Sequence, residues 1–261
     1  MPSSQSSSLT LPALLSWYRD LTRDSHPVGG TDGLIHIYHS AAIDGCSLTL
    51  SESLAFLENG ETTDSKPAPH HWMLLDYQQA QQQMLAWAAD REPLNRARLQ
   101  SIGATLMRRT GGPLHTLLGS YDSSQGEFRL ASPMTAHRKL IDAQKLPAAV
   151  DKLLKQLNTN LAATKTIRQI YDLSFQAHYD LLCLQPFGEG NGRVARLLMN
   201  YVQHYHNLPM SLVHAVDRQA YRRALDQPHA PSFIPPILDF MYNQLITYLQ
   251  TEYERINQEP Y

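Results

Sequence analysis

The 261-residue sequence has few cysteines, no long apolar run and no excess of charge of either sign. Two cysteines, Cys46 and Cys183, are too few for a disulfide framework or a cysteine metal site, and they favour a reducing compartment, so the predicted location is the cytoplasm. No stretch approaches the roughly 18 apolar residues of a membrane span, so no membrane partner is predicted. Lys and Arg total 22 against 24 Asp and Glu, which predicts no nucleic-acid partner. Any anion-binding site must therefore be local.

Apolar residues make up 43% of the chain, which is enough to build a sizeable core. The length favours one large domain, with or without a small appendage. The Ser-rich residues 1–10 are predicted to form a flexible tail, residues 11–94 an N-terminal helical region, and residues 95–261 the core with the C-terminal helices. The polar, proline-containing loop 60–69 is the best candidate linker.

Apolar spacing predicts helices along most of the chain. Thr49 and Glu52 form a capping-box pattern, and the strongest apolar stripe begins at Val194. No helical period is present between Tyr121 and Ile141, and residues 126–141 are predicted to form a short β-hairpin. The predicted helices span residues 11–21, 34–42, 50–59, 71–90, 95–109, 146–163, 167–184, 194–205, 218–226 and 233–255. The fold class is therefore mainly α with one short hairpin.

Gly190, Asn191 and Gly192 stand at the start of the strongest predicted helix. The first backbone N–H groups of a helix have no intrahelical partner, and the helix dipole adds partial positive charge there. Glycines also let the backbone approach a ligand closely. This pattern is typical of a site that binds phosphate.

Arg193 and Arg196 follow at i and i+3, so both project from one side of the first helical turn. Glu189 adds a carboxylate suited to a hard divalent ion such as Mg²⁺. Together these residues predict a site for a nucleotide polyphosphate. The alternative is a glycine-rich loop with two surface arginines and no ligand.

The string from Gln185 to Arg196 reads Gln-Pro-Phe-Gly-Glu-Gly-Asn-Gly-Arg-Val-Ala-Arg. It resembles the signature of the Fic family (filamentation induced by cAMP), His-Pro-Phe-x-Asp/Glu-Gly-Asn-Gly-Arg-x-x-Arg, and differs at the first position, where Gln185 replaces His. Upstream, residues 40–45 resemble the inhibitory segment Ser/Thr-x-x-x-Glu-Gly of many Fic proteins, with Asp44 in place of Glu. The likeness covers roughly residues 35–245.

The resemblance implies a Fic-type helical core in which the 126–141 hairpin is the flap that docks a protein substrate. It also implies transfer of AMP from Mg-ATP to a Tyr, Ser or Thr hydroxyl, with Gln185 at the place of the general base. Ser40 and Asp44 would make the inhibitory contact, and Glu189 would hold the metal. The residues implied to bind the nucleotide are Glu189, Gly190, Asn191, Gly192, Arg193, Arg196 and Tyr221.

Gln185 has no titratable group, so it cannot accept a proton at neutral pH. Loss of a general base typically lowers a rate by ~10²–10⁴. His178 lies on the preceding helix, where a lone histidine is more often a packed residue than a base. Asp44 is one methylene shorter than Glu, so an ion pair to Arg196 would be longer or would require a closer approach of its helix.

Two functions stay open at this point. The first is a Fic-type protein adenylyltransferase that is impaired or inactive as written. The second is a non-catalytic Fic-fold regulator that binds a nucleotide or a partner protein. A homo-oligomer is also left open by the sequence.

Overall fold

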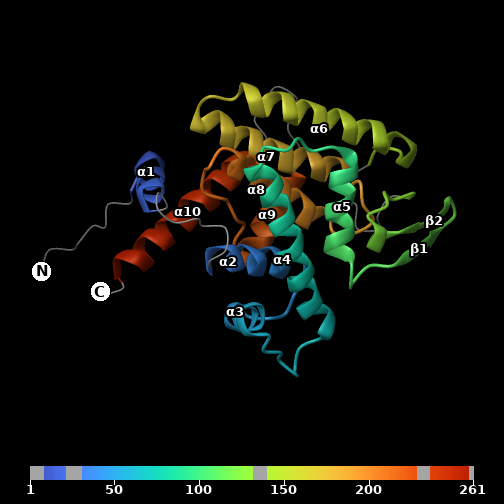
Figure 1. Cartoon of the computed structure of the whole chain (residues 1–261), viewed down its shortest axis with the longest axis horizontal. Helices are drawn as coiled ribbons and strands as arrows, with labels where there is room; N and C mark the ends of the chain where they lie inside the picture. Colours follow the sequence, from blue (N-terminus) through green and yellow to red (C-terminus); the bar gives the residue numbers. More distant parts are fainter. Residues whose placement is uncertain (1–8, 22–30, 132–139, 228–235, 259–261) are drawn as a thin grey trace, which may run out of the picture.

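The structure is a computed structural model that describes residues 9–21, 31–131, 140–227 and 236–258. These residues contain ten α-helices and one two-stranded antiparallel sheet (Figure 1), so the predicted mainly α class is confirmed. The helices are α1 (Leu11–Leu21), α2 (Thr31–Ile43), α3 (Leu50–Asn59), α4 (Ala68–Ala89), α5 (Arg96–Met107), α6 (Leu146–Ala163), α7 (Ile167–Leu184), α8 (Asn191–Tyr205), α9 (Arg218–Asp226) and α10 (Pro236–Gln258). Most of the predicted tail, residues 1–8, lies outside the described residues.

Helices α7 and α8 form the centre of the molecule and pack along one another. The members of the predicted apolar stripe of α8 from Val194 to Val202 are buried, and so are the residues between them, because α4 and α5 also pack on this helix. Helix α4 packs on α8 and α6 on α7, while α1 and α10 pack together at the end of the molecule opposite the sheet (Figure 1). The core therefore positions the start of α8 between elements from both halves of the sequence. No helix in the described ranges is long and apolar enough to cross a membrane.

Local signals fix several helix ends. Thr49 and Glu52 form the predicted capping box of α3, which ends at Gly60 in a left-handed conformation (φ 76°). The loop predicted as a linker joins α3 to α4, and the core cluster includes Phe56 before it and Leu74 after it. The two sides of this loop therefore contribute to one core.

The predicted hairpin at 126–141 is wrong in its position. The hairpin lies just upstream, where β1 (Pro113–Thr116) pairs with β2 (Gly119–Asp122) in antiparallel register. Leu117 and Leu118 form the turn, and Gly119 directly after them has a φ of +122°, which is unfavourable for any residue with a Cβ. Residues 111–113, Gly-Gly-Pro, follow the predicted helix 95–109 and lead directly into β1, a strand that the apolar spacing did not predict.

Residues 126–131 do not pair with the chain that follows them within the described part of the sequence. Phe128 instead makes an isolated antiparallel bridge with Phe187, in the loop between α7 and α8. The β-pattern at this segment was therefore real, but its partner is a distant loop. Residues 132–139 of the predicted hairpin lie outside the described residues.

Candidate nucleotide-binding site

The loop of residues 185–190 joins the end of α7 to the start of α8. Gly190 is the N-cap of α8, with a φ of +77°, and it supplies no side-chain capping bond. The first backbone bond of the helix runs from the Val194 N–H to the Gly190 carbonyl, 3.0 Å away. The N–H groups of residues 191–193 precede it and therefore lack intrahelical acceptors, which is the geometry expected of an anion site.

The side chain of Asn191 holds the loop backbone. Its Oδ1 accepts a hydrogen bond from the Phe187 N–H at 2.9 Å, and its Nδ2 donates to the Phe187 carbonyl at 2.8 Å. The amide is therefore engaged with the loop, and the group that Asn191 presents to an anion is its backbone N–H. Gly188 lies against the hydroxyl of Tyr121, which leaves no room for a Cβ.

Arg193 and Arg196 are buried, and one carboxylate bridges them. Asp44 Oδ2 accepts from Arg193 Nε at 3.0 Å, and Asp44 Oδ1 accepts from Arg196 Nη2 at 3.1 Å. Ser40 completes the contact, because its Oγ accepts from Arg196 Nε at 2.7 Å and its carbonyl accepts from Nη2 at 3.0 Å. The structure thus brings the segment that resembles an inhibitory motif onto the two arginines expected to bind phosphate. The bond from Arg193 to Asp44 was not foreseen from the sequence.

The end of α2 approaches α8 closely enough for the shorter aspartate to reach both arginines. Ile37 and Ala41 bury the helix in the core, and Gly45, with φ +105°, turns the chain directly after Asp44. A Cβ on Gly192 would stand 3.0 Å from Arg196 Nη1 and 3.3 Å from Asp44 Oδ1. The bare face of Gly192 therefore borders the ion pair, at the place where an anion would replace the carboxylate.

Tyr221 and His178 lie in the interior behind Arg196. The Tyr221 hydroxyl is 2.7 Å from His178 Nε2, and both residues are buried. Burial raises the pKa of Tyr221 to about 12 and, with the charge of Arg196, lowers the pKa of His178 to about 3. His178 is thus a packed neutral histidine, as expected, and Tyr221 exposes only 3% of its surface.

Gln185 ends α7 in the left-handed region, with φ 42° and ψ 65°. Its carbonyl accepts a hydrogen bond from Arg129 Nε at 2.7 Å. Arg129 was not singled out from the sequence, where it appeared only as part of the predicted hairpin. Glu189 is exposed on the same loop, nearer α8. Position 185, which is the place of the general base, and Glu189, which would hold a metal, thus lie at opposite ends of one loop.

The residues present fit a Mg²⁺ ion that arrives with phosphate. In the described ranges no cluster of three or more His, Cys, Asp or Glu could hold a metal ion by itself. Mg²⁺ commonly binds through one or two carboxylates together with substrate phosphates and water. The single exposed carboxylate of Glu189 matches that requirement.

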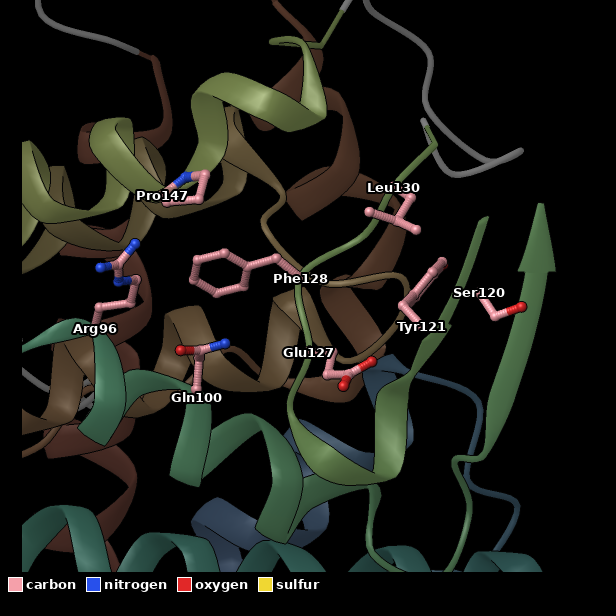
Figure 2. Close-up of a pocket in the computed structure, with 8 residues that line it drawn as sticks. All are labelled: Arg96, Gln100, Ser120, Tyr121, Glu127, Phe128, Leu130 and Pro147. Carbon is pink, nitrogen blue, oxygen red and sulfur yellow. The ribbon is translucent and has the colours of Figure 1, made fainter. Parts of the chain in front are cut away.

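A pocket of about 470 Å³ lies beside this loop, between α5, the start of α6 and the hairpin (Figure 2). Figure 2 shows the ring of Phe128 reaching between Arg96, Gln100 and Pro147, with Tyr121 on the hairpin side. The Phe128 ring also packs edge-on against Phe187 at 5.4 Å, which connects the pocket to the loop. The remaining lining residues are Ser120, Glu127 and Leu130.

Comparison with known proteins agrees with this fold. Residues 93–203 match the model of the Fic/DOC family. The structure of a Fic-domain-containing signaling protein from Bacteroides thetaiotaomicron superposes with a TM-score of 0.74 at 20% identity, over 95% of this chain and 99% of that one. Fic-1 of C. elegans superposes with a TM-score of 0.70 at 18% identity, over 94% and 72%. The fold is that of Fic-domain proteins.

Two curated relatives carry the name protein adenylyltransferase Fic. The one from Nematostella vectensis is 29% identical over 200 residues, and the one from Drosophila melanogaster is 27% identical over 190 residues. These matches cover 74% and 71% of this chain, but 42% and 35% of the relatives. The Fic/DOC match covers residues 93–203, and the chain spans less than half the length of these relatives.

Proposed function

We propose that this chain is a Fic-type protein adenylyltransferase with an intact nucleotide site and an impaired transfer step. The observation that carries the proposal is that Arg193 and Arg196, which lie in the first turns of α8 after its uncapped start, both bond to a single carboxylate, Asp44. Two buried arginines and a helix N-terminus form a site for a polyanion. The names of the curated relatives make ATP the best candidate for that polyanion.

Binding of ATP would require its phosphates to displace Asp44. The carboxylate occupies donors of both arginines, so a phosphate oxygen at the same donors competes with it directly. Glu189 would hold Mg²⁺, and the ion would neutralise phosphate charge when bound. Asp44 and Ser40 therefore act as an inhibitory contact in this proposal.

The transfer step needs a proton acceptor. The oxygen of a protein hydroxyl attacks the α-phosphorus, the bond from that phosphorus to the β-phosphate oxygen breaks, and pyrophosphate leaves. The hydroxyl proton would ordinarily go to a base at position 185, but the amide of Gln185 accepts no proton. His178 is no substitute, because it is buried and bonded to Tyr221. The proton must pass to water, and the rate falls by the ~10²–10⁴ that a general base contributes.

The proposed protein substrate docks on the segment that follows the hairpin. Glu127, Phe128 and Leu130 line the pocket of Figure 2, and Phe128 pairs with the motif loop. A target segment in this pocket would lie beside the loop where its hydroxyl must react. The pocket presents both an apolar surface and the opposite charges of Arg96 and Glu127.

The test uses ATP labelled at the α-phosphate and follows label on the protein itself and on proteins of its own cell extract. We expect little label with the chain as written and a rise of ~10²–10⁴ with Gln185→His. Gln185→Ala is the matched control and should match the unaltered chain. If Gln185→His binds Mg-ATP but transfers nothing, the second function, a nucleotide-binding regulator, becomes the better account, since the intact arginine pair would still explain binding.

A further inference from the structure

Arg129 is a buried cation whose partners are backbone carbonyls. It exposes 1% of its surface and is among the largest fully buried side chains of the protein. Its Nε donates to the Gln185 carbonyl at 2.7 Å, and its Nη2 donates to the carbonyls of Ile141 at 2.8 Å and Leu184 at 3.3 Å. The last carbonyls of a helix carry partial negative charge, so the end of α7 compensates the buried guanidinium.

These bonds converge on the part of the chain with an unfavourable backbone. Gln185 adopts the left-handed conformation although it has a Cβ, and such a conformation persists only where its surroundings hold it. The backbone N–H of Arg129 also donates to the Pro186 carbonyl at 2.9 Å. One residue therefore holds three consecutive carbonyls, from Leu184 to Pro186.

Arg129 also connects position 185 to the segment proposed to dock the protein substrate. It lies between Phe128 and Leu130, which line the pocket, and its bond to Ile141 reaches the far end of the same segment. By contrast, Asp44 accepts hydrogen bonds from Arg193 and Arg196 at the start of α8, and among the described residues Arg129 makes no hydrogen bond there. Arg129 is thus joined to the reacting end of the loop and separate from the phosphate-binding end.

We infer that Arg129 is a positioning residue for the transfer step, which fixes the backbone of residue 185 so that its side chain faces the attacking hydroxyl of the docked substrate. This inference rests on the proposed function. The side chain of Arg129 touches neither nucleotide nor hydroxyl; it acts through the backbone of the loop. A displacement of about 1 Å in a reacting group can lower a rate by about 10²-fold.

The experiment places Arg129→Met and Arg129→Lys in the Gln185→His background and measures kcat, KM and Kd for Mg-ATP. We expect Arg129→Met to lower kcat about 10²-fold while Kd stays within about twofold. Arg129→Lys should recover part of kcat, because an ammonium can still donate to the carbonyls at the end of α7. The matched control is Arg108→Met, an exposed arginine directly after α5 that is bonded to Gln79, and it should leave all three constants unchanged. A parallel loss of kcat and Mg-ATP affinity, or no loss of kcat, would overturn the inference.

A second measurement keeps the inference separable from the proposed function and from misfolding. Hydrogen exchange can be measured in the otherwise unaltered chain, because it does not require activity. It gives the exchange rate of the Gln185 N–H, which donates to the Leu181 carbonyl at 2.9 Å. Arg129→Met should speed exchange at residues 184–187 and leave the interior of α8 protected. Unchanged exchange at 184–187, or equal loss of protection in α8, would contradict a local positioning role. If Gln185→His alone shows no transfer, the proposed function fails while this measurement still decides the role of Arg129 in the loop.

Discussion

The two ends of the loop between α7 and α8 differ in what they retain. At the α8 end, Arg193, Arg196 and the helix N-terminus form a complete anion site, which Asp44 occupies. At the α7 end, the backbone of Gln185 is held by Arg129, but its side chain offers no proton chemistry. We therefore expect anion binding and proton transfer to depend on different residues, so that one can be lost without the other.

The reason lies in the contacts of the two ends. Arg129 bonds to the carbonyl of Gln185, and this bond does not depend on which side chain residue 185 carries. Asn191 likewise holds Phe187 through backbone groups. We therefore expect a substitution at position 185 to leave the shape of the loop intact, and the proposed phosphate site with it.

The largest effect is expected from restoring proton chemistry at the α7 end. Gln185→His should raise transfer by ~10²–10⁴. The rate should also increase with pH through the titration of an imidazole near the ordinary pKa of about 6.5, because only the neutral ring accepts a proton. Single-turnover rates between pH 5.5 and 8 provide the measurement. A rate that rises but does not depend on pH would show that the new side chain acts by some means other than general-base catalysis.

A side chain on Gly192 should abolish nucleotide binding at the α8 end of the loop. A saturating concentration of Mg-ATP, about 100 Kd, should stabilise the unaltered chain by roughly 2.7 kcal/mol, seen as a thermal shift. Gly192→Val should abolish that shift, because its side chain would meet Arg196 and the place of the phosphate. Gly112→Val is the matched control, since a Cβ on Gly112 meets nothing within 4 Å.

Gly192 is a sharper choice than Gly190 for this test. Gly190 has a left-handed φ of +77°, so valine there would strain the backbone, and its Cβ would point toward Met107. Loss of binding in Gly190→Val would therefore report folding as well as phosphate contact. A shift that survives in Gly192→Val would remove the start of α8 as the nucleotide site.

Neutralising Asp44 should strengthen ATP binding at the α8 end of the loop. Asp44→Asn keeps the shape of the side chain but removes the charge that competes with phosphate, so ATP should bind about 5–150-fold more tightly, the range of a typical coupling between sites. ADP should gain less, because it has no γ-phosphate to displace the carboxylate. Calorimetric titration with both nucleotides gives the two ratios, and Asp64→Asn, in the exposed loop before α4, is the control. Equal gains for ATP and ADP would mean that Asp44 does not compete for the γ-phosphate position.

The smallest effect concerns His178, which lies on α7 behind Arg196. Burial lowers its pKa to about 3 from an ordinary value of 6.5, so the folded state keeps it neutral while the unfolded state takes up a proton below pH 6.5. Its contribution to the free energy of unfolding is fully present above pH 6.5 and is lost as pH falls toward 3, by about 1.4 kcal/mol per pH unit. Burial lowers the pKa of His36 in the same direction, to about 3.

Urea unfolding at pH 7 and pH 5 tests this expectation. Between pH 7 and pH 5 the free energy of unfolding should fall less in His178→Asn than in the unaltered chain, and the difference should be the contribution of one titrating group. The contribution of His36 should be the same in both proteins. The transfer rate of Gln185→His should not acquire a new pH dependence from this change. If His178→Asn alters the pH profile of transfer instead, His178 takes part in the proton step, and the α7 end keeps proton chemistry of its own.

The sequence predicted those elements whose signals are local. The bounds of α7 and α9 agree with the apolar spacing, and the capping box at Thr49 starts α3 as expected. The start of α8 was also predictable, because glycines followed by an apolar stripe mark a helix N-terminus within a few residues. The resemblance to the Fic signature supplied the candidate residues, and the Fic/DOC match to residues 93–203 confirms that resemblance.

The contacts that the sequence could not supply join distant segments. Asp44 and Arg193 are 149 residues apart, and only the packing of α2 against α8 brings the carboxylate to both arginines. Arg129 and Gln185 are 56 residues apart, and the strand pattern around Phe128 found its partner in the motif loop instead of in the following residues. Period and turn signals describe a segment and its neighbours, so they carry no information on such pairings.

The most direct test measures the Kd of Mg-ATP and the rate of AMP transfer on the same preparations of the unaltered chain and Gln185→His. Because the phosphate site lies at the α8 end, the account predicts equal Kd values, within about twofold, and a transfer rate ~10²–10⁴ higher in the variant. Equal transfer rates for the two proteins, or failure of both to bind Mg-ATP, would contradict the claim that this loop binds nucleotide at one end and lacks its base at the other.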